Sequence, residues 1–180
     1  MRGANDNLQI TPHMLPILEA AARGLHWTQS VSGLHGELHA GDDLVGRLER
    51  HSIFGTLATG ESADGCWTFK RVGFLQTRAT IRQCNGDTDI GAFRDNTWNS
   101  GGTLELDSGA SFRVTTNFWT TRLEFLLDDD TPFVAFELSG ILKRSANVVI
   151  HPSATSHRDT PLVVLFGWYL AVMLDGDGAA

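Results

Sequence analysis

The sequence predicts a mainly β protein: a closed antiparallel barrel of about 12 strands around a buried hydrophobic C-terminal helix, with a short N-terminal helix outside. Two observations lead to this prediction. From Leu25 to about His151, short β-favouring runs alternate with compact turn sequences, which is typical of a sandwich or a barrel. From Leu162 to Leu174, 13 consecutive residues carry no formal charge and nearly all are large and apolar. A helix that is apolar on every face must be surrounded, and a closed ring of strands surrounds it completely.

Residues 1–24 are predicted to form a polar tail followed by a short helix. Pro16 suits the first position of a helix and Gly24 a C-terminal stop, so we expect this helix over roughly 16–23. It is expected to cover one end of the core from outside. No linker, low-complexity run or charge block follows, so residues 25–180 form the barrel with its central helix at about 161–174.

The strands are inferred from turn sequences and from period-two alternation. In 121-TRLEFLL-127, for example, Leu123, Phe125 and Leu127 share one face, and the charged residues Arg122 and Glu124 lie on the other. One apolar and one solvated face indicate an antiparallel sheet. The expected strands are 25–31, 33–39, 43–50, 53–59, 66–73, 77–84, 88–95, 102–106, 111–118, 121–127, 133–139 and 147–151.

The C-terminal apolar run has three possible roles: a membrane anchor, a partner-binding tail, or the inside of the protein. Its 13 residues would span about 20 Å as a helix, whereas a bilayer core needs about 20 residues. Asp175 and Asp177 follow the run and no Lys or Arg anchors that end. We therefore predict a buried core helix and no transmembrane segment.

The charge balance argues against a nucleic-acid partner. The formal net charge is −7, with 14 basic residues against 21 acidic ones, whereas nucleic-acid binders concentrate Lys and Arg. The N-terminus has no apolar core of signal-peptide length, so we expect a cytoplasmic protein, peripheral at the membrane if a basic patch attracts it there. In that reducing compartment Cys66 and Cys84 are expected to be free thiols, although they flank one strand-turn-strand stretch and can meet across strands.

Motifs for metal binding and catalysis are weak. His35 and His39 would stand about 13 Å apart in a strand, too far for both to bind one zinc ion, so we expect no metal site. The acidic stretch 128-DDDT-131 is interpreted as a hairpin tip rather than a calcium loop. We find no nucleophile elbow, Walker loop or dinucleotide-binding glycine pattern, and therefore expect neither an enzyme nor a cofactor. Trp98, in a Gly/Asn-rich turn, is the best candidate for an exposed aromatic contact.

Four stretches carry a resemblance to a known superfamily: 65-GCWTFKRVGF-74, 101-GGTLELDSGASFRV-114, 117-NFWTTRLEF-125 and 161-PLVVLFGWYLAVML-174. They resemble a bacterial branch of the tubby C-terminal-like superfamily, which includes the LURP-one-related proteins and the phospholipid scramblases. The resemblance covers roughly residues 25–175. It implies a twelve-stranded barrel closed around a hydrophobic C-terminal helix.

The resemblance also implies a binding function. Tubby domains hold phosphoinositide headgroups with clustered Lys and Arg on the barrel surface. The nearest basic pairs in this chain are Lys70 with Arg71 and Lys143 with Arg144, with Arg78 and Arg82 as possible neighbours. The scramblase calcium segment and cysteine-rich palmitoylation sites have no convincing counterpart. We therefore expect a non-catalytic module for an anionic lipid headgroup. The alternative is a protein-interaction or scaffolding domain that uses the barrel rim.

Overall fold

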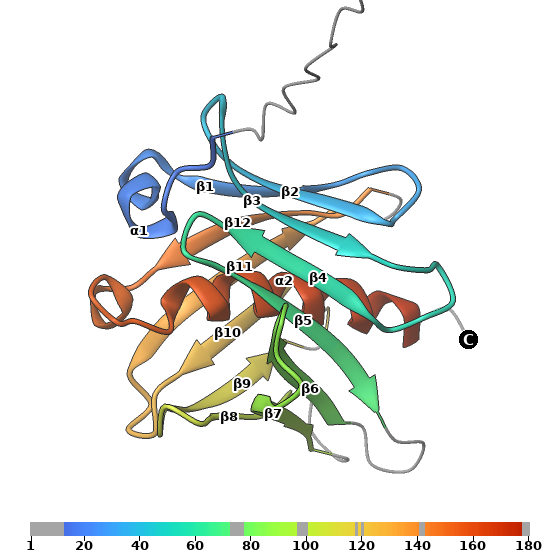
Figure 1. Ribbon diagram of the computed structural model, residues 1–180. Coiled ribbons are helices and arrows are strands. Elements are labelled where there is room, and N and C mark those ends of the chain that lie inside the picture. The colour runs from blue at the N-terminus through green and yellow to red at the C-terminus, as the bar shows by residue number, and fades with distance from the viewer. Residues whose placement is uncertain are drawn as a thin grey trace, which may run out of the picture.

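The computed structural model describes residues 13–72, 78–96, 101–117, 119, 121–140 and 143–177. Within them the predicted fold class is confirmed: twelve antiparallel strands form a closed barrel in which neighbours in the sequence are paired and β12 returns to β1 (Figure 1). The strands are β1 Leu25–Gln29, β2 His35–Ala40, β3 Asp43–Arg50, β4 Ala58–Ser62, β5 Gly65–Val72, β6 Arg78–Gln83, β7 Asp89–Asp95, β8 Gly101–Leu106, β9 Ser111–Thr116, β10 Arg122–Leu126, β11 Pro132–Ser139 and β12 Ser145–Ile150. Trp98 and the N-terminal tail of residues 1–12 lie outside the described residues.

One predicted strand lies elsewhere. The expected strand 53–59 is a loop up to Leu57, and β4 begins only at Ala58. The apolar pair Ile53 and Phe54 led to the wrong boundary, because apolar residues between two turns are usually core residues. Here both side chains are exposed.

The C-terminal run forms helix α2, Thr160–Asp177, along the barrel axis (Figure 1). All of its residues from Thr160 to Val172 are buried, as predicted for a helix enclosed by strands. Trp168 stacks on Trp27 of β1 with ring centroids 5.3 Å apart, and Phe166 packs edge-on against Phe69 of β5. None of the helices in the described residues is long and apolar enough to cross a bilayer.

The barrel wall approaches α2 closely where either the strand or the helix has a glycine. A Cβ atom on Gly36 of β2 would lie 2.4 Å from Nε1 of Trp168, and one on Gly167 of α2 would lie 2.3 Å from the ring of Phe136. Contacts this short do not occur between real atoms, so these positions accept only glycine without repacking of the core.

The N-terminal helix lies outside the barrel as predicted. Helix α1, Ile17–Ala20, continues into the 3₁₀ turn η1, Ala21–Arg23, and Gly24 ends it with a φ of 80°. Ile17 is fully buried, and its backbone N–H donates to Oδ2 of Asp64 at 2.9 Å. This short helix therefore covers the end of the barrel where α2 begins (Figure 1). A second 3₁₀ turn, η2 at Pro152–Ala154, leads from β12 toward α2.

The prediction of two free thiols is wrong. Cys66 of β5 and Cys84, the residue after β6, form a disulfide with their Cα atoms 5.4 Å apart. Strand register explains the pairing: Trp67 lies opposite Gln83, so the next pair is Cys66 and Cys84, and the N–H of Cys84 donates to the carbonyl of Cys66 at 3.1 Å. Cysteine spacing alone does not contain this register. The bond closes a stretch of 18 residues, which stabilises the fold by about 3 kcal/mol through the entropy of the unfolded chain.

The connections between strands alternate between the two ends of the barrel, because every strand runs antiparallel to its neighbours. At the end where α2 begins, five short turns connect the strands. Together these turns contain seven aspartates and no Lys or Arg, and we call this end of the barrel the aspartate end. These residues are Asp42, Asp64, Asp87, Asp107, Asp128, Asp129 and Asp130. At the other end, where α2 ends, the described residues of the connections are 30–34, 51–57, 96, 117, 119, 121, 140, 143 and 144, and we call it the loop end.

Candidate functional site

A surface groove on the outer face of β5 and β6 is the candidate binding site. It has a volume of about 340 Å³ and contains three cationic side chains and one carboxylate, so its formal charge is +2 on a chain of net charge −7. We call it the basic groove. It is lined by Leu57, Thr68, Lys70, Val72, Arg78, Thr80, Arg82 and Asp89.

Strand register brings these side chains together. Successive residues of a strand face opposite sides, so Phe69 enters the core while Thr68 and Lys70 face outward. Lys70 pairs with Thr80 across the hairpin, and Thr68 pairs with Arg82. The groove therefore unites Lys70 with Arg78 and Arg82, which the sequence suggested only as possible neighbours.

Asp89 of β7 holds the two arginines in place. Its carboxylate accepts a hydrogen bond from Nε of Arg82 at 2.6 Å and another from Nη2 of Arg78 at 3.3 Å. Lys70 is exposed, and within the described part of the chain no residue pairs with its ammonium group. The groove thus offers one unpaired cation beside two oriented guanidinium groups, an arrangement suited to an anion.

Arg71 belongs to a different environment from Lys70. Phe69 and Arg71 share the inner face of β5, and Arg71 lies near the hydroxyl of Tyr169 at the loop end of the interior. Its backbone carbonyl accepts a hydrogen bond from Oγ1 of Thr56 at 3.1 Å. Lys70 and Arg71 are neighbours in the sequence, but Lys70 lies in the outer groove and Arg71 faces the interior.

The second predicted pair, Lys143 and Arg144, does not join the basic groove. It lies in the connection from β11 to β12, and the carbonyl of Arg144 accepts a hydrogen bond from the N–H of Gln29 at 2.9 Å. Strands β1 to β4 separate β12 from β5 around the barrel. Desolvation lowers the pKa of the half-buried Arg144 guanidinium, whereas Lys143 is exposed.

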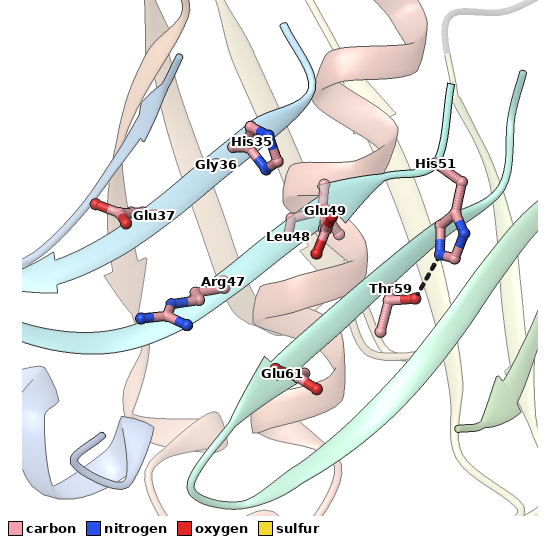
Figure 2. Close-up of a pocket in the computed structure, with 9 residues that line it drawn as sticks. All are labelled: His35, Gly36, Glu37, Arg47, Leu48, Glu49, His51, Thr59 and Glu61. Atoms are coloured by element: carbon pink, nitrogen blue, oxygen red, sulfur yellow. Dashed lines mark hydrogen bonds between the residues drawn. The ribbon is translucent and has the colours of Figure 1, made fainter. Parts of the chain in front are cut away.

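A second groove, of about 360 Å³, lies on the outer face of β2, β3 and β4 (Figure 2). Arg47 stands between Glu37 and Glu61 in the strand register, and Glu49 lies opposite His35. With three glutamates and one arginine, this groove is a poorer anion site than the basic groove. Among the residues described, no three His, Cys, Asp or Glu side chains are grouped so as to hold a metal ion.

The acidic stretch of residues 128–131 forms the turn between β10 and β11, as predicted for a hairpin tip. Hydrogen bonds from the Thr131 hydroxyl and then from its backbone N–H lower the pKa of the exposed Asp129 carboxyl. Asp130 adopts a φ of 65° and pairs with Arg113 of β9. The carboxylates of Asp129 and Asp130 are therefore engaged by Thr131 and by Arg113, as in an ordinary hairpin turn.

Tyr169 of α2 provides a pH-dependent test of the barrel interior. Burial raises its pKa from 10.0 to about 12, and its hydroxyl donates to the carbonyl of Thr56 at 2.7 Å. The folded protein keeps a proton that the unfolded chain releases, so this stabilisation is complete below pH 10 and is lost as the pH rises toward 12. We expect the free energy of unfolding to fall by about 3 kcal/mol over that interval.

The measurement is unambiguous because Tyr169 is the only tyrosine in the chain. Tyrosinate absorbance of the native protein should develop near pH 12, and that of the protein in denaturant near pH 10. Tyr169→Phe is the control: it should lower stability at neutral pH and remove this part of the alkaline loss. Native absorbance that already rises around pH 10 would contradict the buried position.

Comparisons with family models, with curated proteins and with solved structures found no match to this chain.

Proposed function

We propose that the chain is a non-catalytic binding module of the tubby-like kind, and that the basic groove holds an anionic lipid headgroup. The observation that carries the proposal is the convergence of Lys70, Arg78 and Arg82 on one groove with a single carboxylate among its lining residues. A barrel closed around a C-terminal helix is also the architecture that the resemblance implied.

The groove has the chemistry that a phosphate group requires. Lys70 supplies an unpaired positive charge, and the two arginines are oriented in advance by Asp89. Guanidinium groups match the geometry of phosphate oxygens, and ammonium groups bind phosphate as point charges. Lys70 is exposed and the two arginine side chains are about half exposed, which favours weak, salt-dependent binding over a deeply buried ligand.

The disulfide bears on where such a module acts. We expected a cytoplasmic protein, whereas disulfides persist mainly in oxidising compartments. Lipid headgroups face both sides of a membrane, so the proposed binding accommodates either location.

The proposal is tested by co-sedimentation with phosphatidylcholine vesicles that do or do not contain phosphatidylserine. We expect binding only to the anionic vesicles, weakening as salt is added. A basic residue near an anionic membrane contributes about 1 kcal/mol, and Lys70→Glu reverses the charge, so the loss is about 2 kcal/mol and partitioning should weaken about 30-fold. Lys70→Glu with Arg78→Glu should abolish it.

Two control variants locate the effect. Arg113→Glu makes the same change of total charge on β9, with β6, β7 and β8 between it and β5, and should weaken binding far less. Lys143→Glu reports separately on the pair in the β11–β12 connection. Absence of binding even at low salt would refute the lipid proposal and favour a protein partner at the barrel rim.

A further inference from the structure

The exposed large apolar side chains gather at one end of the barrel. Across the described residues there are five of them, and each lies in a connection at the loop end rather than in a turn at the aspartate end. Scattered exposed apolar residues are ordinary, but their restriction to one end is not expected by chance. They are Val31, Ile53, Phe54, Leu57 and Trp119.

Hydrogen bonds from Arg50 and Tyr169 hold the backbone of the loop that contains Phe54. Nη2 of Arg50 donates to the carbonyls of Ile53 and Gly55 at 3.2 and 3.3 Å, and Tyr169 donates to that of Thr56 at 2.7 Å. The side chain of Phe54 is nevertheless 94% exposed. The hydrogen-bonded backbone of this loop therefore holds the Phe54 side chain in solvent.

The loop that contains Trp119 is also held by hydrogen bonds. The side chain of Asn117 closes its loop, accepting hydrogen bonds from the N–H groups of Thr121 and Arg122 at 2.8 and 3.0 Å and donating to Oγ1 of Thr121 at 2.7 Å. Trp119, at the centre of this loop, is 78% exposed.

Val31 tops a third closed loop. The Ser30 hydroxyl accepts a hydrogen bond from the N–H of His35 at 3.1 Å, and the N–H of Gly33 donates to the carbonyl of Ser30 at 2.9 Å. Val31 itself is 89% exposed. Three separate loops around the rim therefore each hold an apolar side chain in water.

Charge distinguishes the loop end from the aspartate end. The described residues of the loop end include no Asp or Glu and two basic residues, Lys143 and Arg144. The opposite turns contain seven aspartates. Helix α2 also ends at the loop end. An anionic surface would repel the aspartate end and admit the loop end.

We propose that the loop end is a membrane-docking surface, with Val31, Phe54 and Trp119 entering the interfacial layer of an anionic bilayer while the aspartate end faces away from it. This inference rests on the proposed function and names the orientation in which that function is performed. Aromatic side chains that carry a polar atom are enriched at membrane interfaces, where one end of the ring is in an apolar medium and the other is hydrated.

The orientation also explains how the basic groove reaches a headgroup. Leu57 belongs both to the exposed apolar set and to the lining of the groove. Lys70 lies two residues before the end of β5 at Val72, which places it about 7 Å from the rim. The headgroup layer of one leaflet is about 5–8 Å thick. Shallow insertion of the tips therefore places Lys70 at headgroup depth.

The test uses the full chain and the vesicles of phosphatidylcholine with phosphatidylserine, now also prepared with brominated acyl chains. Bromine quenches tryptophan only at close range, so fluorescence of the wild type should decrease on binding and Trp119→Phe should lose most of that decrease. Phe54→Ser and Trp119→Ser should each weaken binding about 10-fold, because each removes an inserted apolar side chain. Ala63→Ser, in an aspartate-end turn, should not change it.

The outcomes separate the two proposals. If Lys70→Glu abolishes binding while Phe54→Ser and Trp119→Ser bind as the wild type does, the groove binds lipid and the docking orientation is refuted. If the wild type does not bind vesicles at all, both proposals fail. Self-association or partner binding that depends on Phe54 without vesicle binding would show that the loop end is a protein contact. Circular dichroism should show unchanged thermal melting for the loop variants, whose side chains are exposed.

Discussion

A chain that ends at Asp159 is expected to show no cooperative thermal unfolding, because it lacks the helix around which the barrel closes. Nine large apolar side chains of α2, from Leu162 to Val172, are buried against the inner faces of the strands. At about 1.5–3 kcal/mol each, their burial contributes about 14–27 kcal/mol before conformational entropy is subtracted. Domains have a net stability of only about 5–15 kcal/mol. The truncated chain should therefore unfold or aggregate rather than survive as a shortened domain.

Circular dichroism and thermal melting of the truncated protein measure this directly. A membrane anchor or a partner-binding tail predicts the opposite result, a folded barrel released from its tail. A cooperative melt from the chain that ends at Asp159 would therefore contradict the enclosed position of α2. The matched control is a chain that ends at Asp177, which removes only residues beyond the helix and should melt as the full chain does.

Replacement of Gly167 by aspartate is expected to cost most of the stability of the domain. A Cβ at this position would lie 2.3 Å from the ring of Phe136 and 3.0 Å from that of Phe125. Overpacking of this kind costs about 1–3 kcal/mol. The carboxylate would in addition be buried among apolar side chains without a partner, which costs about 3–5 kcal/mol.

Thermal melting of Gly167→Asp and Gly86→Asp provides a matched comparison. A Cβ on the exposed Gly86 meets its neighbours at ordinary distances of 3.6 Å and more, so that variant should retain wild-type stability. Burial would raise the pKa of the new carboxyl at position 167, and this variant should therefore be less unstable at acidic pH. Equal melting temperatures for the two variants would show that α2 is not packed closely against β11.

The strand count and the central helix were predictable because both depend on local patterns. Turn sequences at short intervals define hairpins, and an uncharged run of 13 residues defines a helix that must be enclosed. The error at β4 has the same origin. Ile53 and Phe54 have the composition of a strand, and only the placement of the loop shows that they face solvent.

The basic groove was predictable only in part. Lys70 was identified from its sequence neighbour Arg71, but Arg71 faces the interior, and the actual companions Arg78 and Arg82 come from the next strand. Lys70 lies beside Arg78 and Arg82 because it pairs with Thr80, and that pairing is set by the register of the hairpin. The same register joins Cys66 to Cys84, for which the expected reducing compartment had led to a prediction of free thiols.

The sequence by itself determined that the chain forms hairpins, that they enclose an apolar helix, and that acidic turns recur along it, because these properties follow from residue type and short-range spacing. Only the tertiary structure decided which turns share an end. Closure of an antiparallel ring brings Asp42 and Asp128 to one end and Phe54 and Trp119 to the other, although each pair is distant in the sequence. The physical reason is that successive connections of an antiparallel ring alternate between its two ends. Every second connection therefore lies at the same end, however far apart the connections are in the sequence.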